Sequence, residues 1–427
     1  MMKKLGRKIS IYTLCVSAAF AFIGCSSDSD STEDILNEFS ISSAVYDNNR
    51  TETVADDTLY VYFNKSIDFD AVLADNNISD LLIIDGNGSI DAASIVDYND
   101  TFFHRLKISL GAASSSFDID TTKIALVTSF IDGFDVSASS VVVNAFRPIL
   151  KTGQTVVYTA NDDGAYQKGV TRSYTDNGDG TIKDNAMGII WEQEDDGELR
   201  DWNASNEYCK NLTKASLSWR MPTIDELVYL MDKGKTNPAI NDIFTNVKNA
   251  YWSANDYLLS TADDAWTVNS FLGNTNDPDK NTTYYIRCVS SEDDGMTDVT
   301  YIRDSAQETV VDTSTNLVWQ DDITAVGDEN KKSWNEALEF CENLSLADKT
   351  DWRLPNLDEL NSVTDKTRTS PAMSPEFLNT SSAQYWSSTT NDNNSSKAWY
   401  AYFGCGCNDI QDKTIEYNVR CVRSSEN

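Results

Sequence analysis

The sequence is poor in histidine, in basic residues and in long apolar runs. Its 427 residues include one histidine, His104, and a single histidine cannot form a catalytic or metal site by itself. Lysine and arginine together number 34 against 67 aspartates and glutamates, so the formal net charge is −33. A field of this sign repels phosphate backbones and anionic lipid headgroups. We therefore expect no nucleic-acid partner, and any membrane attachment requires a device other than surface charge.

The amino terminus has the layout of a secretory signal. A basic start at residues 3–8 is followed by an apolar run over residues 9–23. This run is shorter than the roughly 20 residues that a membrane-spanning helix requires. Gly24 before Cys25 resembles the lipobox of bacterial lipoproteins, whose cysteine becomes the acylated first residue. The resemblance implies a lipoprotein signal peptide at 1–24 and a lipid anchor on Cys25, with palmitate among its acyl chains.

Residues 25–35 are rich in serine and aspartate, which is typical of a solvated tether. Together with the lipid anchor, this acidic tether predicts a protein of the cell envelope, held in the outer membrane and exposed at the surface. Simple secretion, with Cys25 incidental, is the alternative.

Residues 36–147 contain no cysteine and no tryptophan. Short apolar runs in this region are separated by Asp, Asn, Gly and Ser turns, and they span residues 58–63, 81–84, 106–110, 123–127 and 141–143. Several short strands at this spacing predict an antiparallel β-sandwich of immunoglobulin-like type, although a barrel gives the same pattern. Because nothing here concentrates aromatic or reactive groups, we interpret the region as a spacer.

The remaining chain contains one module twice. The stretch Trp219–Leu227 returns as Trp352–Leu360, with the shared pattern Trp-Arg-X-Pro-X-X-Asp-Glu-Leu. Other landmarks recur in the same order and at a nearly constant offset: Trp202 and Trp334, Cys209 and Cys341, Trp252 and Trp386, Trp266 and Trp399, and Cys288 and Cys421. Two copies indicate tandem domains rather than a solenoid, which needs at least about three short repeats. We place the copies at 149–291 and 298–425.

The repeated stretch predicts the start of a short helix. Proline disfavours helical geometry for the residue before it, and Thr223 or Asn356 after it can cap a helix with a side-chain oxygen. Glu226 and Glu359, three residues on, complete a capping box. We therefore interpret these acidic residues as structural rather than catalytic. Around them, a strand, an amphipathic helix and several short strands predict an α+β module.

A glycine-rich stretch over residues 174–184 predicts a tight hairpin. Asp176 and Asp179 in this turn are weak calcium candidates. The spacing of an EF-hand and its closing glutamate are absent, so we favour a simple hairpin turn over a calcium site.

These motifs as a set resemble the Lcl C-terminal domain family, which is found on bacterial surface proteins and is named from a collagen-like adhesin. The matching text is residues 151–154, residues 175–181, and the Trp-Arg-X-Pro, Tyr-Trp-Ser and Arg-Cys-Val motifs that each occur twice. The resemblance covers about 149–424. It implies a fold similar to C-type lectin-like and formylglycine-generating-enzyme domains, and it implies sulfated glycosaminoglycan ligands.

Duplication predicts how the cysteines pair. Each copy has one cysteine in its helix and one near its last strand, so we expect the bonds Cys209–Cys288 and Cys341–Cys421. Each bond closes a loop of about 80 residues and contributes about 4 kcal/mol in the chain-entropy model. Cys405 and Cys407 have no counterpart in copy one. They form either a local disulfide or, by the resemblance to formylglycine-generating enzymes, a copper oxidase centre.

The ligand candidates lie between the Tyr-Trp-Ser motif and the last strand of each copy, where lectin-like folds place their ligand loops. Amides and carboxylates in this region suit sugar hydroxyls or a calcium ion, and the candidates are Asn255, Asp256, Asp263, Asp264, Asn274, Asn276, Asp277, Asp279, Asn391, Asp392, Asn393 and Asn394. Ordinary solvated loops give the same composition. The Glu-Pro-Asn signature of calcium-dependent lectins is missing. For Trp252, Trp266, Trp386 and Trp399 we favour core packing over sugar stacking.

The sequence thus predicts a multidomain protein, with an all-β immunoglobulin-like sandwich followed by two α+β C-type-lectin-like modules. We expect adhesion, or binding of an extracellular glycan or of a matrix or host protein, through the module loops and without catalysis. The net charge favours neutral glycans or proteins over polyanions. Two alternatives stay open, namely a copper oxidase using Cys405 and Cys407 and a structural envelope protein without a soluble ligand.

Overall fold

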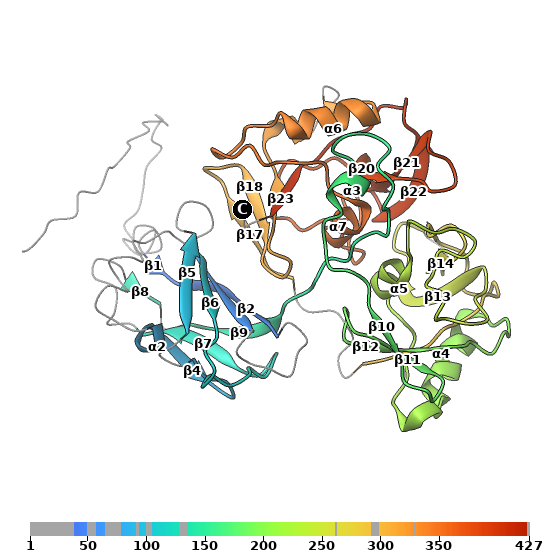
Figure 1. Ribbon diagram of the computed structural model, residues 1–427, viewed down its shortest axis with the longest axis horizontal. Coiled ribbons are helices and arrows are strands. Elements are labelled where there is room, and N and C mark those ends of the chain that lie inside the picture. Colours follow the sequence, from blue (N-terminus) through green and yellow to red (C-terminus); the bar gives the residue numbers. More distant parts are fainter. Residues whose placement is uncertain are drawn as a thin grey trace, which may run out of the picture. The chain divides into compact units, whose positions relative to one another are not determined.

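The computed structural model (Figure 1) describes residues 38–48, 57–64, 78–90, 94–99, 105–127, 135–137, 139–260, 263–291, 299–325, 327 and 330–424. The predicted signal peptide, the anchor Cys25, the tether and His104 lie outside these residues. Phe39–Asn427 forms one compact unit, which is mostly β and contains several small sheets. None of the described helices is long and apolar enough to cross a membrane.

The amino-terminal region is built on a seven-stranded sheet with the order β4-β7-β9-β2-β3-β6-β5. Its strands are β2 (Ile41–Asp47), β3 (Thr58–Phe63), β4 (Leu82–Asp85), β5 (Ile95–Asn99), β6 (Arg105–Ser109), β7 (Lys123–Leu126) and β9 (Ser140–Ala145). Strands β1 (Glu38–Phe39) and β8 (Asp135–Val136) pair separately, and α2 (Ile78–Leu81) precedes β4. Within the seven-stranded sheet β2 and β9 run parallel, and the other pairs are antiparallel.

Strand β3 is buried on both faces, and its alternation separates two cores. Leu59, Val61 and Phe63 pack in the core of the amino-terminal region, whereas Tyr60 and Tyr62 belong to a cluster formed with the second copy. The strand-rich character predicted for this region is therefore confirmed, with the one-turn helix α2 as an addition. Its immunoglobulin-like topology stays a prediction.

Each copy of the repeat contains a four-stranded and a three-stranded sheet with matching strand order. In copy one these are β10-β11-β12-β16 and β13-β14-β15, and in copy two they are β17-β18-β19-β23 and β20-β21-β22. The strands of copy one are β10 (Tyr174–Asp176), β11 (Thr181–Asp184), β12 (Ile189–Glu192), β13 (Ala250–Asp256), β14 (Ala265–Asn269), β15 (Thr275–Asn276) and β16 (Val289–Ser290). Those of copy two are β17 (Tyr301–Asp304), β18 (Thr309–Asp312), β19 (Leu317–Gln320), β20 (Gln384–Thr390), β21 (Lys397–Tyr402), β22 (Cys407–Asp412) and β23 (Val422–Ser424). The duplication in sequence is thus a duplication of backbone.

In the sequence of each copy, the helices follow the first three strands of the four-stranded sheet and precede the three-stranded sheet. Copy one has α4 (Trp202–Asn211), the 3₁₀ turn η2 (Lys214–Ser216) and α5 (Ile224–Leu230). Copy two has the 3₁₀ turn η3 (Ile323–Ala325), α6 (Trp334–Glu342) and α7 (Leu357–Ser362), and α3 (Asp163–Tyr166) precedes both copies' sheets. Both predicted capping boxes are present, with Thr223 and Glu226 at α5 and Asn356 and Glu359 at α7.

The arginine of the repeated motif has a specific partner in each copy. Arg220 makes a two-pronged ion pair with Glu226, through distances of 2.8 and 2.7 Å. Arg353 pairs with Glu359 in the same way, through distances of 2.6 and 2.5 Å. The glutamate therefore caps the helix, as the capping box predicts, and it also binds the guanidinium of the arginine just before the helix.

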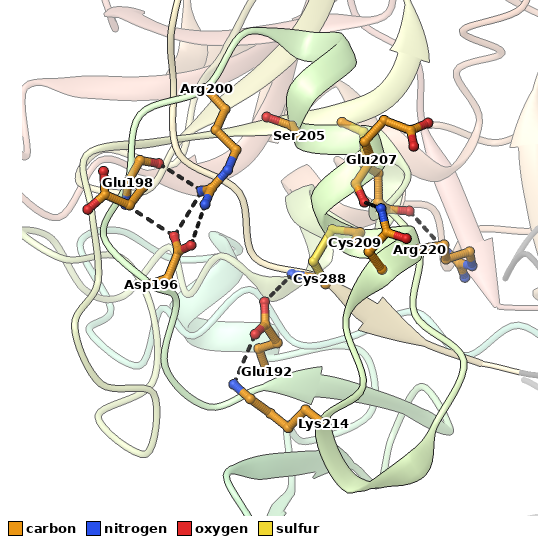
Figure 2. The surroundings of a disulfide bond; sticks show 12 residues. Glu192, Asp196, Glu198, Arg200, Ser205, Glu207, Cys209, Lys214, Arg220 and Cys288 are labelled. Atoms are coloured by element: carbon orange, nitrogen blue, oxygen red, sulfur yellow. Dashed lines mark hydrogen bonds and ion pairs between the residues drawn. A yellow bond between two sulfur atoms is a disulfide. The ribbon is translucent and has the colours of Figure 1, made fainter.

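The disulfides Cys209–Cys288 and Cys341–Cys421 are both present, with Cα atoms 5.6 and 5.5 Å apart. Each joins the amphipathic helix of its copy to the segment before the last strand. Figure 2 shows the first bond above Glu192, which accepts from the backbone N–H of Cys288 at 3.0 Å and from the Lys214 ammonium at 2.9 Å. The bond joins α4 to the segment before β16, and the ion pair joins β12 to the 3₁₀ turn η2.

Residues 149–170, which we predicted as the start of copy one, contact copy two. The Thr389 hydroxyl donates to the carboxylate of Asp163 at 2.8 Å, and the backbone N–H of Thr390 donates to the Gln154 side chain at 2.6 Å. We call residues 149–170 the strap. The chain between the amino-terminal region and copy one thus bonds to the β20 strand of the more distant copy.

Candidate functional site

The twelve predicted ligand residues do not form one site. In copy one, Asp256 and Asp263 lie on either side of Lys280, whose ammonium is 2.7 Å from each carboxylate. The same ammonium lies over the Trp202 ring, 4.7 Å from its centroid. These two carboxylates therefore share one counter-charge within the protein.

Asn255 stabilises the backbone. Its side-chain oxygen accepts from the N–H of Ile224 at 2.8 Å, at the first residue of α5. Copy two uses Thr389 in the same place, where its hydroxyl accepts from the N–H of Leu357 at 3.0 Å. The two residues satisfy an N–H group that a helix start leaves without an intrahelical partner.

Lys280, Asp256 and Asp263 are called the Lys280 group below. Asp264 and Asp279 form an isolated antiparallel bridge next to it in the sequence. The Asp279 carboxylate accepts from the backbone and the side chain of Asn281, both at 2.8 Å. These hydrogen bonds lower the pKa of Asp279. The bridge joins the end of the loop between β13 and β14 to the segment that follows β15.

The copy-two candidates form a polar turn after β20. Asn391 accepts from the N–H of Asn394 at 3.0 Å, and Asn394 in turn accepts from Ser396 at 3.1 Å. Asn393 accepts from the Thr236 hydroxyl at 2.9 Å. The exposed Asp392 borders a small recess beside the strap. The turn is thus largely satisfied by its own hydrogen bonds.

The last three candidates, Asn274, Asn276 and Asp277, lie on or beside β15, where a cavity of about 180 Å³ opens between the copies. Copy one contributes Trp266, Thr275 and Asp277 to its lining. Copy two contributes Gln384, Tyr400, Tyr402, Cys407, Asn408 and Asp409. We call this space the seam cavity. Of the twelve predicted residues only Asp277 lines it.

Two strand pairings build the walls of the seam cavity. On the copy-two side Tyr400 pairs with Asp409, and Tyr402 pairs with Cys407, across β21 and β22. Tyr400 and Tyr402 are both half-buried and share one strand face, because side chains alternate along a strand. That period-two pattern is the sequence signal for these rings, and a prediction based on amides and carboxylates in loops does not find them.

The two copies are joined by hydrogen bonds at the cavity and away from its lining. The backbone N–H of Asn408 on β22 donates to the Thr275 hydroxyl on β15 at 3.1 Å. The Lys366 ammonium of copy two donates to Asp225 of copy one at 2.6 Å. We call the contact made by these two pairs the seam.

Two buried polar atoms at the cavity lack hydrogen-bond partners among the described residues. They are the indole N–H of Trp266 and the side-chain oxygen of Asn408, and each of these residues is 2% exposed. Burying a polar group without a partner is costly. Both atoms are closed off from solvent, so neither is exposed to a ligand in the cavity, and the indole N–H of the counterpart Trp399 lacks a partner in the same way.

Acidic groups shape the electrostatics of the cavity. Burial raises the pKa of Tyr400 to about 12, and the neighbouring Asp409 charge adds to the rise. Burial also raises the pKa of Tyr257, again with a contribution from the carboxylate of Asp277. The Tyr257 ring meets the Trp266 ring edge-on, with centroids 4.8 Å apart. Both tyrosines stay neutral hydroxyls at physiological pH, next to carboxylates.

The tryptophans that recur in both copies pack in the core. Trp252, Trp266, Trp386 and Trp399 are each at most 2% exposed. The indole N–H groups of Trp252 and Trp386 donate to the backbone oxygens of Arg200 and Lys332, both at 3.0 Å. Core packing is therefore confirmed for these residues, and Trp266 additionally borders the seam cavity.

The remaining candidates have local partners. Asp176 accepts from the N–H of Gly178 at 2.8 Å, and Asp179 accepts from the N–H of Thr181 at 3.1 Å, within the predicted hairpin of β10 and β11. Within the described part of the chain, no cluster of His, Cys, Asp and Glu has the arrangement of a metal site. Calcium dependence stays a hypothesis.

Cys405 and Cys407 are bonded to each other. Copper(I) binds thiolates, so the copper oxidase hypothesis applies only to a reduced form of this pair. In the bonded form Cys405 packs against the core of copy one, and Cys407 lines the seam cavity.

Comparisons with known proteins agree with the duplication. A model of the Lcl C-terminal domain matches residues 180–290 and 308–423, which together exceed half of the chain. Among solved structures, the chain is similar to the Yersinia pseudotuberculosis adhesin InvE at 10% sequence identity, and the match covers 92% of this chain and 100% of that chain. The TM-score is 0.20, so this likeness supports no conclusion. No curated protein matches the sequence.

Proposed function

Because this chain belongs to the Lcl C-terminal domain family through two consecutive copies, we propose that it is a binding protein of the cell envelope that holds a carbohydrate in the seam cavity. The proposal moves the ligand from the loops of each copy to the space between them. Adhesion to an extracellular glycan is the biological role that follows.

The lining of the seam cavity carries this proposal. Aromatic rings suit the apolar face of a sugar ring, and amide and carboxylate oxygens suit its hydroxyl groups. Tyr400 and Tyr402 supply the rings, and Gln384, Asn408 and Asp409 supply the polar groups. The predicted loops lack such a combination, since their polar groups are engaged by one another or by Lys280.

The rest of the chain is proposed to deliver this cavity to the cell surface. An acylated Cys25 anchors the protein in the outer membrane, and the acidic tether and an immunoglobulin-like spacer carry the two copies outward. We propose a C-type-lectin-like fold for each copy, based on its short helices and two small sheets. A matrix or host protein displaying the glycan is the natural partner.

A glycan array with the purified full-length chain, run with and without calcium, tests the proposal. We expect binding that Tyr400→Ala reduces and that Asn393→Ala, in the polar turn of copy two, leaves unchanged. Thermal unfolding of each variant separates loss of ligand from loss of fold. If the wild-type protein binds no glycan on the array, a structural role in the envelope is favoured. If Asn393→Ala loses binding and Tyr400→Ala does not, the ligand site lies in the loops and not in the seam cavity.

A further inference from the structure

We propose that the seam cavity selects a sugar that carries a free, positively charged amine; this inference rests on the proposed function and names its ligand class. Asp277 of copy one and Asp409 of copy two both line the cavity. Among its lining residues in the described part of the chain there is no lysine, arginine or histidine. Two carboxylates without a basic neighbour favour a cation between them.

The contrast with the loop carboxylates shows why this arrangement points to a ligand. Asp256 and Asp263 share the ammonium of Lys280 at 2.7 Å. Within the described residues, neither Asp277 nor Asp409 has an ion-pair partner, and one oxygen of Asp409 accepts only from the neighbouring N–H of Ile410 at 2.8 Å. The two loop carboxylates therefore share one cation, whereas Asp277 has the Tyr257 hydroxyl as a partner and the two cavity carboxylates have no cation among the described residues.

The duplicated chain supplies an internal comparison for the aromatic wall. Trp399 of copy two has the Lys233 ammonium over its ring, 4.9 Å from the centroid. Trp266 is its counterpart in copy one, and among the described residues it has no cation over its ring. Lys366, the counterpart of Lys233, pairs with Asp225 instead. An ammonium in the seam cavity would take the corresponding place, attracted by the rings of Trp266, Tyr400 and Tyr402.

The lining carboxylates distinguish among ligands. An N-acetylated sugar has no charge, so it gains no attraction from Asp277 and Asp409. A quaternary ammonium has no N–H to donate to a carboxylate, whereas a primary ammonium has three. The chemistry therefore favours an amino sugar.

The size of the cavity limits how much of the glycan it holds. Sites for drug-sized ligands enclose roughly 300–1,000 Å³, and the seam cavity has about 180 Å³. This space suits one sugar ring rather than an oligosaccharide. We infer that the cavity takes a terminal residue of a de-acetylated glycan, with the rest of the chain outside.

Titration calorimetry of the full-length, oxidised protein with glucosamine, N-acetylglucosamine and glucose tests the inference at mildly acidic pH. We expect glucosamine to bind at least about tenfold more tightly than the other two sugars. The variant Asp277→Asn/Asp409→Asn should remove this preference while it keeps weak binding of glucose. Asp263→Asn, in the Lys280 group, should preserve the preference.

The outcomes separate the two proposals. Equal affinity for the three sugars would overturn the amine selection and leave the carbohydrate function standing. Absence of binding to any of them, together with a silent glycan array, would overturn both. Methylammonium chloride is the further control, since binding as tight as that of glucosamine would show an ammonium site without sugar recognition and would overturn the inference.

Discussion

The Lys366 ammonium of copy two lies 2.6 Å from the carboxylate of Asp225 in copy one, and this pair is the ionic contact of the seam. Lys366 is 8% exposed and also donates to the Thr364 hydroxyl at 3.0 Å. A buried lysine needs such partners because an unpaired charge in the protein interior is costly.

Substitution of Lys366 by methionine is expected to weaken the seam. Asp225 would lose its partner, and we expect a loss of roughly 2–4 kcal/mol of unfolding free energy, as for broken pairs that are mostly buried. Sugar binding should fall in parallel, since the cavity walls come from both copies. Urea unfolding measures the first effect. Lys235→Met is the matched control, because its pair with Asp242 is at the same 2.6 Å but exposed, and it should cost less than about 1 kcal/mol.

The two long disulfides are expected to contribute more stability than the short one. Cys209 and Cys288 are 79 residues apart, whereas Cys405 and Cys407 are separated by 2. In the chain-entropy model the long loop contributes about 4 kcal/mol and a very short loop much less. We expect Cys209→Ser/Cys288→Ser to lower the thermal midpoint strongly and Cys405→Ser/Cys407→Ser to lower it little. A larger effect of the second variant would show that packing of Cys405 matters more than loop closure.

The strap is expected to make stability depend on pH through Asp163. Burial raises the pKa of this carboxyl to about 7, although hydrogen bonds from Thr152 and Thr389 lower it. Because the folded pKa exceeds the unfolded one, the native state binds more protons between about pH 4 and pH 7. The contribution of this group to stability therefore falls as pH rises through this window and is constant above it.

Asp163→Asn should remove that part of the pH dependence. An amide keeps an oxygen that accepts from Thr152 and Thr389, and it carries no charge to desolvate. We expect the wild type and the variant to converge in stability near pH 4 and the variant to be more stable above pH 7. Denaturant unfolding across the pH range measures the difference. A constant difference at every pH would contradict the raised pKa.

The two motif glutamates are expected to differ in their effect on stability. Arg353 is buried with Glu359, whereas the Arg220 side chain that pairs with Glu226 is 27% exposed. Glu359→Gln leaves a buried guanidinium without its counter-charge, which costs on the order of 3 kcal/mol. Glu226→Gln should cost clearly less, because water screens Arg220. Glutamine can still complete the capping box, so equal losses in chemical denaturation would contradict the account in which exposure of the arginine decides the cost of removing the charge.

Features that depend on local or repeated patterns could be predicted from the sequence. The capping boxes at Thr223 and Asn356 follow from short-range chemistry, and duplication alone pairs Cys209 with Cys288. The strap shows the limit, because Asp163 reaches Thr389 far along the chain and no local pattern predicts that contact.

The cavity could not be predicted for the same physical reason. It depends on how β15 meets β22, where Thr275 and Asn408 touch, and these strands belong to different copies. Composition predicts a ligand site in the polar loops. The polar groups of a loop can instead form hydrogen bonds with one another, as those of Asn391 and Asn394 do. Only the packed structure shows which carboxylates are compensated and which face a space.

The most direct test is the stoichiometry of sugar binding to the full-length protein. Two independent lectin-like copies would bind two equivalents of sugar per chain. A cavity built from both copies binds one, and Lys366→Met should reduce that binding although it alters no residue of the lining. One site per chain with this dependence on the seam is the result we predict, and two sites of similar affinity, unaffected by the substitution, would contradict it.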